Sequence, residues 1–301
     1  MLPDIHSPAE RLTGESTGFV WRPATPPSST LVLVHGLQSH AGWFVDAGPR
    51  LAERGVAVYA PDRRGSGADT SGVRGDIADY RHWLMDLEQV IRQARADYPR
   101  SSIHLVGHCF GANVALGCAL RKHVDNHVRS VVMLTPGLYV LPGYGLFDRL
   151  RIGLASVFAP ETRFRVPQDD ALFSRDPEVV AWIGADTLGA RSVTARCLVQ
   201  VDRMLRELRN SLGNLDVPLL VVEASRDRLS DNMRNRRLLE ARLGERCRWV
   251  SFDAEHFLLA EPCRDQVIDA LVDWTTATCD GKHVERSSHE NTDYWCHGFR
   301  G

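Results

Sequence analysis

The chain has 301 residues, of which 44% are hydrophobic and 25% are charged, and its formal net charge is −2. This composition is typical of a globular protein with a large core, and the near-neutral charge gives no reason to expect nucleic acid as a partner. No apolar run approaches the ~20 residues that a membrane-spanning helix needs, so we expect no transmembrane segment.

The start of the chain and the cysteines bear on where the protein works. Residues 1–15 are polar and interrupted by proline, unlike a secretory signal peptide. Seven cysteines are scattered through the predicted strands and helices, and an odd number without a spacing pattern favours reduced thiols. We therefore expect a cytoplasmic protein.

The first strongly apolar run, at 31–34, predicts a buried strand that leads into His35-Gly36-Leu37. A loop of this kind after a strand can present a backbone N–H to a reacting oxygen. We expect the N–H of Leu37 to be such a donor. His35 is expected to be hydrogen-bonded beneath the loop rather than catalytic.

A strand over 56–60 and a helix over most of 77–98 are predicted next. Between them, the run GSG at 65–67 could be mistaken for a phosphate-binding loop. The third glycine of a dinucleotide-binding fingerprint and the lysine of a P-loop are both missing. We expect a tight turn here and no cofactor.

The most informative run is GHCFG at 107–111, between an apolar strand at 102–106 and a small-residue helix at 112–120. A sharp strand-to-helix turn between two glycines lifts a nucleophile to the head of a helix. The unpaired N–H groups there stabilise a thiolate or an oxyanion. We expect Cys109 to be a nucleophile and the N–H of Phe110 to be the other oxyanion donor. The alternative is a buried cysteine in a glycine-rich helix start.

After a strand over 130–134, the alternation of strands and helices breaks at 138–215, where the chain is helical and rich in arginine. An insertion at this point is expected to form a cap over the active site. Its apolar first part, 144–158, either is a mobile lid that contacts lipid or a carrier, or packs over the core and lines the pocket. Four nearby arginines either bind the phosphate of a coenzyme A- or carrier-bound substrate or form a solvated face: Arg149, Arg151, Arg163 and Arg165.

Two further strands, at 219–224 and 248–252, each lead into a loop with a titratable side chain. The first loop contains Asp227 and the second contains His256. The carboxyl ends of parallel strands share one edge of a sheet, where ligands bind, so both side chains are expected near Cys109. Nucleophile, acid and histidine follow in this order along such chains. Asp231 is the alternative orienting acid.

Taken in order, these motifs resemble an α/β-hydrolase, most closely the monoacylglycerol lipase and lysophospholipase branch of serine aminopeptidase type. The similarity covers about 18–277 and includes VHG, APDRRGSG and the nucleophile turn, together with FSRDPEVV in the expected cap and HFLLAEP around the histidine. It implies a mostly parallel sheet flanked by helices, with a helical cap inserted after the strand that ends near Leu134. The chain departs from the family at Cys109, where serine is usual, and at 37–40, where LQSH stands in place of the common Gly-Glu-His.

The expected organisation follows from this resemblance. Residues 1–137 and 216–277 form the hydrolase core, 138–215 form the cap, and 278–301 form a polar, disordered tail. Several side chains near the C-terminus could ligate a metal ion on paper, but their spacing fits no standard zinc pattern, and we expect no metal: Cys279, His283, His289, Cys296 and His297.

A cysteine nucleophile restricts the substrate. His256 would take the thiol proton, Asp227 would hold the imidazole, and Cys109 would attack an acyl carbon to give a thioester. A thiolate is a much better leaving group than an alkoxide, so an adduct with an alkyl ester reverts unless His256 protonates the alkoxide. Thioesters, activated esters and strained lactones are therefore better matched.

Three functions remain open from the residues. The first is an acyl hydrolase or thioesterase with a Cys-His-Asp triad. The second is an acyltransferase or cyclase that delivers the acyl group to an amine, alcohol or thiol. The third is a non-catalytic binding protein, against which the retained acid and histidine argue. A serine-to-cysteine change introduced by design would leave the fold intact and weaken ester hydrolysis. The expected partner is a small acyl ester or thioester, with peripheral lipid contact through the cap.

Overall fold

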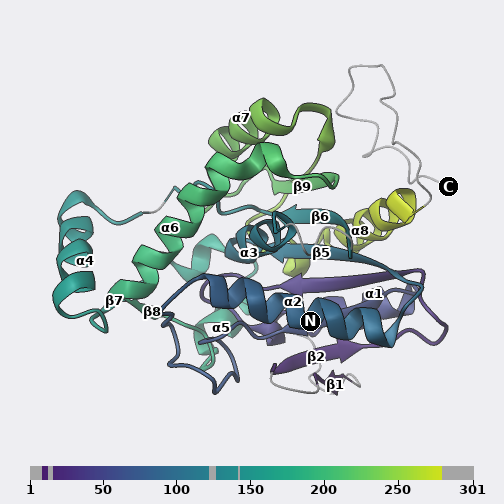
Figure 1. Cartoon of the computed structure of the whole chain (residues 1–301), viewed down its shortest axis with the longest axis horizontal. Coiled ribbons are helices and arrows are strands. Elements are labelled where there is room, and N and C mark those ends of the chain that lie inside the picture. The colour runs from purple at the N-terminus through teal and green to yellow at the C-terminus, as the bar shows by residue number, and fades with distance from the viewer. Residues whose placement is uncertain (1–8, 13–15, 122–126, 142, 280–301) are drawn as a thin grey trace.

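A computed structural model describes residues 9–12, 16–121, 127–141 and 143–279. Within them an eight-stranded sheet has the order β1-β2-β4-β3-β5-β6-β9-β10, with helices on both faces (Figure 1). Its strands are β1 (Glu10–Arg11), β2 (Gly18–Trp21), β3 (Ser29–Val34), β4 (Ala57–Pro61), β5 (Ser102–His108), β6 (Val128–Leu134), β9 (Leu219–Ala224) and β10 (Cys247–Phe252).

The sheet is mostly parallel. From β4 to β10 in sheet order every neighbouring pair is parallel, whereas β2 pairs antiparallel with β1 and β4. Strands β3, β4 and β9 are buried along their whole length, as expected for a parallel sheet covered on both faces. This burial explains why these strands read as continuous apolar runs rather than as alternating patterns.

Two hydrophobic cores lie on opposite faces of the sheet. One packs α2, α3, α6 and α7 against it, and the other packs α1 and α8. Figure 1 shows α2 crossing in front of the strands. The helices are α1 (Ala47–Glu53), α2 (Arg81–Asp97), α3 (Phe110–Ala119), α4 (Leu146–Phe158), α5 (Pro177–Ala185), α6 (Ala195–Ser211), α7 (Asn232–Leu243) and α8 (Arg264–Cys279), with 3₁₀ turns at Ala41–Phe44, Asp170–Leu172, Leu212–Asn214, Gly244–Arg246 and Leu258–Ala260.

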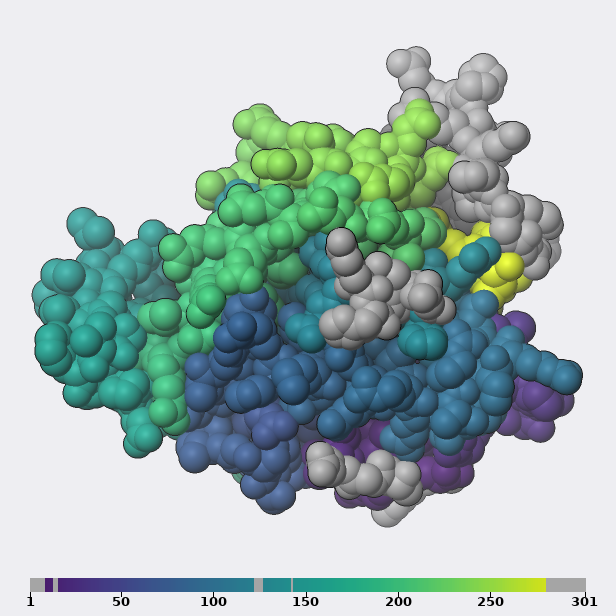
Figure 2. All heavy atoms as spheres, in the orientation of Figure 1, coloured from purple at the N-terminus to yellow at the C-terminus, as the bar shows by residue number. Residues whose placement is uncertain are grey.

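The chain between β6 and β9 contains α4, α5 and α6 together with a two-stranded antiparallel sheet of β7 (Arg163–Arg165) and β8 (Ser192–Thr194). Helix α4 packs on α6 and projects from the body of the molecule, at the left of Figures 1 and 2. Ile152 is its buried residue, while Leu146, Phe147 and Phe158 are 87%, 72% and 82% exposed. The alternative in which this apolar segment packs over the core is therefore wrong for most of its side chains.

Helix α2 covers most of 77–98, as predicted; it begins at Arg81, and Ile77 and Tyr80 are buried in the segment that precedes it. The predicted boundaries on either side of Cys109 were too short. Strand β5 continues to His108, and α3 starts directly after Cys109. The glycines at 107 and 111 belong to these elements because the turn itself is a single residue.

The expected tail boundary after residue 277 falls inside α8, which ends at Cys279. Thr278 is buried, and its carbonyl accepts a hydrogen bond from Arg129 Nε at 2.8 Å, so the helix stays packed to its end. The rest of the expected tail lies outside the described residues, as do His283, His289, Cys296 and His297. Among the described residues no group of side chains has the makings of a metal site.

None of the described helices combines the length and the apolar character that crossing a bilayer requires. The cysteines in the described ranges are all free thiols, so the packing described here depends on no disulfide.

Candidate active site

A single strained residue connects β5 to α3. Cys109 has φ of +54° and ψ of −117°, a conformation that L residues rarely adopt. A Cβ atom at Gly107 would lie 2.3 Å from Ala112 Cα, and one at Gly111 would lie 2.0 Å from the Val34 carbonyl oxygen. Glycine is thus required on both sides, which explains the spacing of the GHCFG run.

Backbone hydrogen bonds hold the strained residue in place. The Cys109 N–H donates to the Leu134 carbonyl at 2.9 Å, and the Cys109 carbonyl accepts from the N–H groups of Ala112 and Gly137 at 3.1 and 3.3 Å. Phe110 is the first residue of α3, so its N–H has no acceptor within the helix. The Cys109 side chain is only 6% exposed.

Asp227 and His256 form a buried pair at the same edge of the sheet. Asp227 follows β9 and His256 follows β10, and His256 Nδ1 lies 2.8 Å from Asp227 Oδ2 and 3.0 Å from Oδ1. Asp227 Oδ1 also accepts the N–H groups of Leu229 and Ser230 at 2.8 and 2.9 Å. These donors orient the carboxylate, which leaves Nε2 as the ring nitrogen free to exchange a proton. Within the described part of the chain, that atom is buried without a hydrogen-bond partner.

The charges at this edge favour a proton on the histidine. Burial lowers the pKa of His256, but the negative charges of Asp227 and Cys109 outweigh it and raise this pKa to about 10. Burial by itself raises the pKa of Asp227, but the charge of His256, its hydrogen bond and the two backbone N–H donors bring this pKa below its usual value. The two shifts together favour a charged Asp227 carboxylate beside a protonated His256.

Asp231, the alternative acid, is used elsewhere. Its side chain caps α7 by accepting the Arg234 N–H at 3.0 Å. The geometry thus brings Asp227 rather than Asp231 to the histidine.

His108 supports the histidine loop, a contact that the sequence did not suggest. Its Nε2 lies 3.2 Å from the His256 carbonyl, and its ring lies 5.1 Å from the His256 ring and 5.2 Å from the Phe257 ring. Burial, together with the charge of His256, lowers the pKa of His108 to about 3. Neutral His108 therefore donates its Nε2–H to the loop. In the sequence, only its position next to Cys109 pointed to a role for His108 at the site.

The loop that contains Leu37 rests on a hydrogen-bonded histidine, as expected. His35 Nδ1 lies 2.9 Å from the Gly36 carbonyl, and His35 Nε2 accepts the Arg63 N–H at 3.0 Å. Burial and the nearby Arg63 charge hold the pKa of His35 well below its usual value. The ring is therefore neutral, with its proton on Nδ1. Arg63 lies just ahead of GSG at 65–67, where the sequence predicted only a tight turn.

A buried carboxylate precedes the catalytic-candidate histidine. Glu255 is paired with Arg175 at 2.6 Å and with Arg226 at 3.2 Å, and its N–H donates to Glu261 Oε2 at 3.1 Å. These bonds tie the segment ahead of His256 to neighbouring loops. Glu255 therefore stabilises the position of the histidine loop.

Three of the four arginines considered for phosphate binding contact the chain itself. Arg149 Nε donates to the Tyr144 carbonyl at 2.9 Å, and Arg151 pairs with Asp148 at 3.2 Å. Arg163 donates to the Ser192 side chain and carbonyl and to the Arg74 carbonyl. Arg163 and Arg165 lie on β7, whereas Arg149 and Arg151 lie on α4. These contacts favour the alternative of a solvated face.

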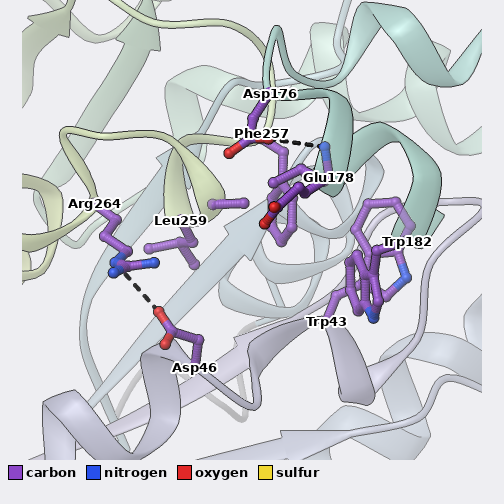
Figure 3. A pocket seen from close by; sticks show the side chains of 10 residues that line it. Trp43, Asp46, Asp176, Glu178, Trp182, Phe257, Leu259 and Arg264 are labelled. Carbon is purple, nitrogen blue, oxygen red and sulfur yellow. Dashed lines mark hydrogen bonds and ion pairs between the residues drawn. The ribbon is translucent and has the colours of Figure 1, made fainter. Parts of the chain in front are cut away.

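A pocket lies beside the histidine loop (Figure 3). Trp43 forms one wall, with ring centroids 5.0 Å from Phe257 and 5.5 Å from Trp182. On the opposite side Asp46 pairs with Arg264 at 3.4 Å. Phe257 joins this pocket to the site because it directly follows His256, although the lining residues do not include the triad candidates.

Known proteins resemble this chain in sequence and in fold. Residues 25–262 match the family described as serine aminopeptidase, S33. The chain is 30% identical over 215 residues to an uncharacterized abhydrolase domain-containing protein of Dictyostelium discoideum, covering 70% of this chain but only 22% of that protein. It is 27% identical to a monoacylglycerol lipase of Mycolicibacterium smegmatis, over 85% of this chain and 90% of the relative. The structure of a monoacylglycerol lipase from Paleococcus ferrophilus superposes with a TM-score of 0.75 at 22% identity, covering 86% of this chain and 98% of that one.

Proposed function

Because the chain belongs to the serine aminopeptidase S33 family and has the α/β-hydrolase fold, we propose that it is an acyl hydrolase in which Cys109 is the nucleophile. His256 is the general base and acid, and Asp227 orients it. The observation that carries the proposal is the buried Asp227–His256 pair, 2.8 Å apart, at the sheet edge where the strained turn presents Cys109. The similarity to monoacylglycerol lipases supports acyl esters or thioesters as the substrate class.

The proposed reaction has two steps. His256 Nε2 takes the thiol proton as Cys109 Sγ bonds to the acyl carbon, and the carbonyl electron pair moves to oxygen. The resulting oxyanion accepts hydrogen bonds from the N–H groups of Leu37 and Phe110. When the carbonyl re-forms, the leaving group departs and takes up the proton from His256 Nε2, which leaves a thioester on Cys109 and a neutral histidine. Water, deprotonated by His256, then attacks the thioester, and the thiol and the free acid are released.

Leaving-group chemistry supports a thioester or another activated acyl group. Beside a negatively charged Cys109 the pKa of His256 is about 10, so at neutral pH the histidine keeps the proton that it has taken from the thiol. An adduct with an alkyl ester expels the Cys109 thiolate more readily than the alkoxide, and it reverts unless His256 protonates the alkoxide. A thiolate leaving group needs no proton to depart. We therefore propose thioesters and activated esters ahead of simple alkyl esters.

A second candidate is acyl transfer to an amine, alcohol or thiol. Its support is the burial of the reacting groups, since the side chains of His256 and Asp227 are fully enclosed and Cys109 is nearly so. A site that limits water gives a bound acceptor an advantage over hydrolysis. A purely binding role has less support, because binding does not require the acid–histidine pair.

We also propose that 138–215 forms a cap on a core made of 1–137 and 216–277. Phe173 supports this arrangement: its carbonyl accepts the Phe257 N–H at 2.8 Å, and its ring lies 5.4 Å from the His256 ring in an edge-on contact. Movement of the segment that contains Phe173 would therefore uncover the histidine. The exposed apolar side chains of α4 support lipid contact by the same segment.

Intact-protein mass spectrometry tests the nucleophile directly. Wild type, Cys109→Ala and Cys263→Ala are incubated with a panel of acyl thioesters and activated esters. We expect an adduct of acyl mass on wild type and on Cys263→Ala, the matched control with a partly exposed thiol, and none on Cys109→Ala. Loss of the adduct in water identifies a hydrolase, whereas loss only with an added amine, alcohol or thiol identifies a transferase. An adduct that persists in Cys109→Ala, or no adduct on any protein, would overturn the proposal.

A further inference from the structure

We propose that Arg63 is a positioning residue that fixes and polarises the peptide group whose N–H, that of Leu37, receives the oxyanion. The inference rests on the proposed function and adds a residue to its machinery. Arg63 follows β4, and its side chain is only 5% exposed. Among the described residues no carboxylate lies within ion-pair distance of it, and its Nη1 is buried without a partner. A buried cation that lacks a counter-ion is costly, so its retention calls for a reason.

The Arg63 side chain is hydrogen-bonded to the backbone of the loop after β3. Its Nη2 donates to the Gly36 carbonyl at 2.6 Å and lies 3.4 Å from the Leu37 carbonyl, and its Nε donates to the His35 carbonyl at 3.4 Å. The guanidinium carbon lies over the rings of Trp83 and Phe110, 5.2 and 5.1 Å from their centroids. Aromatic faces on this cation limit where the planar group can move.

The geometry of the Gly36–Leu37 peptide group relates these hydrogen bonds to the oxyanion donor. The Gly36 carbonyl accepts two donors, Arg63 Nη2 at 2.6 Å and His35 Nδ1 at 2.9 Å. In a planar trans peptide the C=O and the following N–H point in opposite directions, so fixing the Gly36 carbonyl fixes the Leu37 N–H. This peptide borders the nucleophile, since a Cβ at Gly36 would lie 3.4 Å from Cys109 Cβ.

The charge on Arg63 adds to the effect of position. A cation at a carbonyl oxygen draws electrons from the amide and makes its N–H a stronger donor. Burial lowers the pKa of Arg63 only to about 10, so the group is protonated at neutral pH. A side chain that merely supported the loop would not need this charge.

The test separates a reaction that forms an oxyanion from one that does not. Acylation of Cys109 by an acyl thioester passes through a tetrahedral oxyanion, whereas alkylation of the same thiol by iodoacetamide does not. Removing a direct oxyanion donor lowers rates by about 10²–10³-fold, so for Arg63→Met, which acts through a peptide, we expect a loss of about 10–100-fold in acylation. The iodoacetamide rate should stay within about threefold, and the loss should fall on kcat more than on KM.

Arg64→Met is the matched control, because Arg64 is adjacent but its guanidinium pairs with Asp86. It should leave both rates within about threefold. If Arg63→Met does not fold, Arg63→Lys carries the same test, with a smaller loss confined to acylation. Equal losses in both reactions, or a loss in neither, would overturn the role of Arg63. A wild-type protein that iodoacetamide alkylates at Cys109 but no thioester acylates would instead overturn the proposed function.

Discussion

The carboxyl edge of the sheet and helix α4 distribute their side chains in opposite ways. At the sheet edge, titratable groups such as Cys109, Asp227 and His256 are buried, and each is held by named hydrogen bonds or by a neighbouring charge. On α4, Phe147 and Phe158 are exposed although they are apolar. Buried polar side chains must keep their hydrogen-bond partners, so their geometry is fixed. Exposed apolar side chains are available to an external partner. The two regions should therefore respond very differently to substitution.

The largest effect is expected at the acid. Asp227→Asn should lower the acylation rate by about 10³–10⁴-fold, because an amide at this position no longer holds His256 with its proton on Nδ1. Asp231→Asn is the matched control, since asparagine also caps helices well, and it should change the rate by less than about threefold. Single-turnover acylation of Cys109 measures both variants. Comparable losses in the two would mean that the observed contact does not select the acid.

Replacing a glycine by alanine should have opposite effects on stability in the two regions. Gly111→Ala places a Cβ about 2.0 Å from the Val34 carbonyl oxygen, and we expect unfolding or a loss of more than about 3 kcal/mol. A Cβ at Gly153 in α4 meets nothing within 4 Å. Gly153→Ala should therefore raise stability by about 0.5–1 kcal/mol through helix propensity. Chemical denaturation measures both, and a tolerated Gly111→Ala would mean that the turn can relax.

Two buried histidines, His256 and His108, should make the free energy of unfolding depend on pH. The pKa of His256 is raised from 6.5 to about 10 on folding, so its stabilising contribution is complete below pH ~6.5 and is lost as pH rises toward 10. The pKa of His108 is lowered to about 3, so its neutral ring opposes folding as pH falls below ~6.5.

Urea denaturation across pH 4–10 tests both directions. Wild type should lose stability between pH 6.5 and 10, and His256→Gln should flatten that limb. His108→Gln should reduce the slope on the acid side only in part, because the pKa values of buried His35 and His104 are lowered as well. His82→Gln, at an exposed site on α2, should leave the profile unchanged. An unchanged alkaline limb in His256→Gln would contradict the assigned protonation.

The smallest effect on the folded protein is expected on α4. Phe147→Ser with Phe158→Ser should change stability by less than about 0.5 kcal/mol, because both side chains are exposed. The same variant should bind vesicles of neutral and anionic phospholipid several-fold more weakly than wild type, as sedimentation measures. Turnover of a soluble short-chain thioester should remain as in wild type. Vesicle binding that does not change would argue against α4 as the lipid-contacting surface.

The α/β-hydrolase fold and the loops that carry the candidate triad could be predicted from the sequence alone. Buried parallel strands are continuous apolar runs, as at 219–224, which is β9 without change. The GHCFG run also predicted its turn, because the close approach of strand and helix excludes any side chain at 107 and 111. The apolar runs and the contact of Gly107 with Ala112 are local along the chain, whereas the contact at Gly111 is with Val34 on β3.

Which side chains meet across loops could not be predicted and became visible only in the folded protein. Asp227 and Asp231 are four residues apart, and the difference between them is that one faces His256 while the other caps α7. Arg63 acts on a loop 27 residues earlier, and His108 contacts a carbonyl 148 residues later. The exposure of α4 likewise depends on where the helix packs. Apolar pattern and turn chemistry report local preference, whereas contacts between distant loops arise only when the sheet brings its strand ends together.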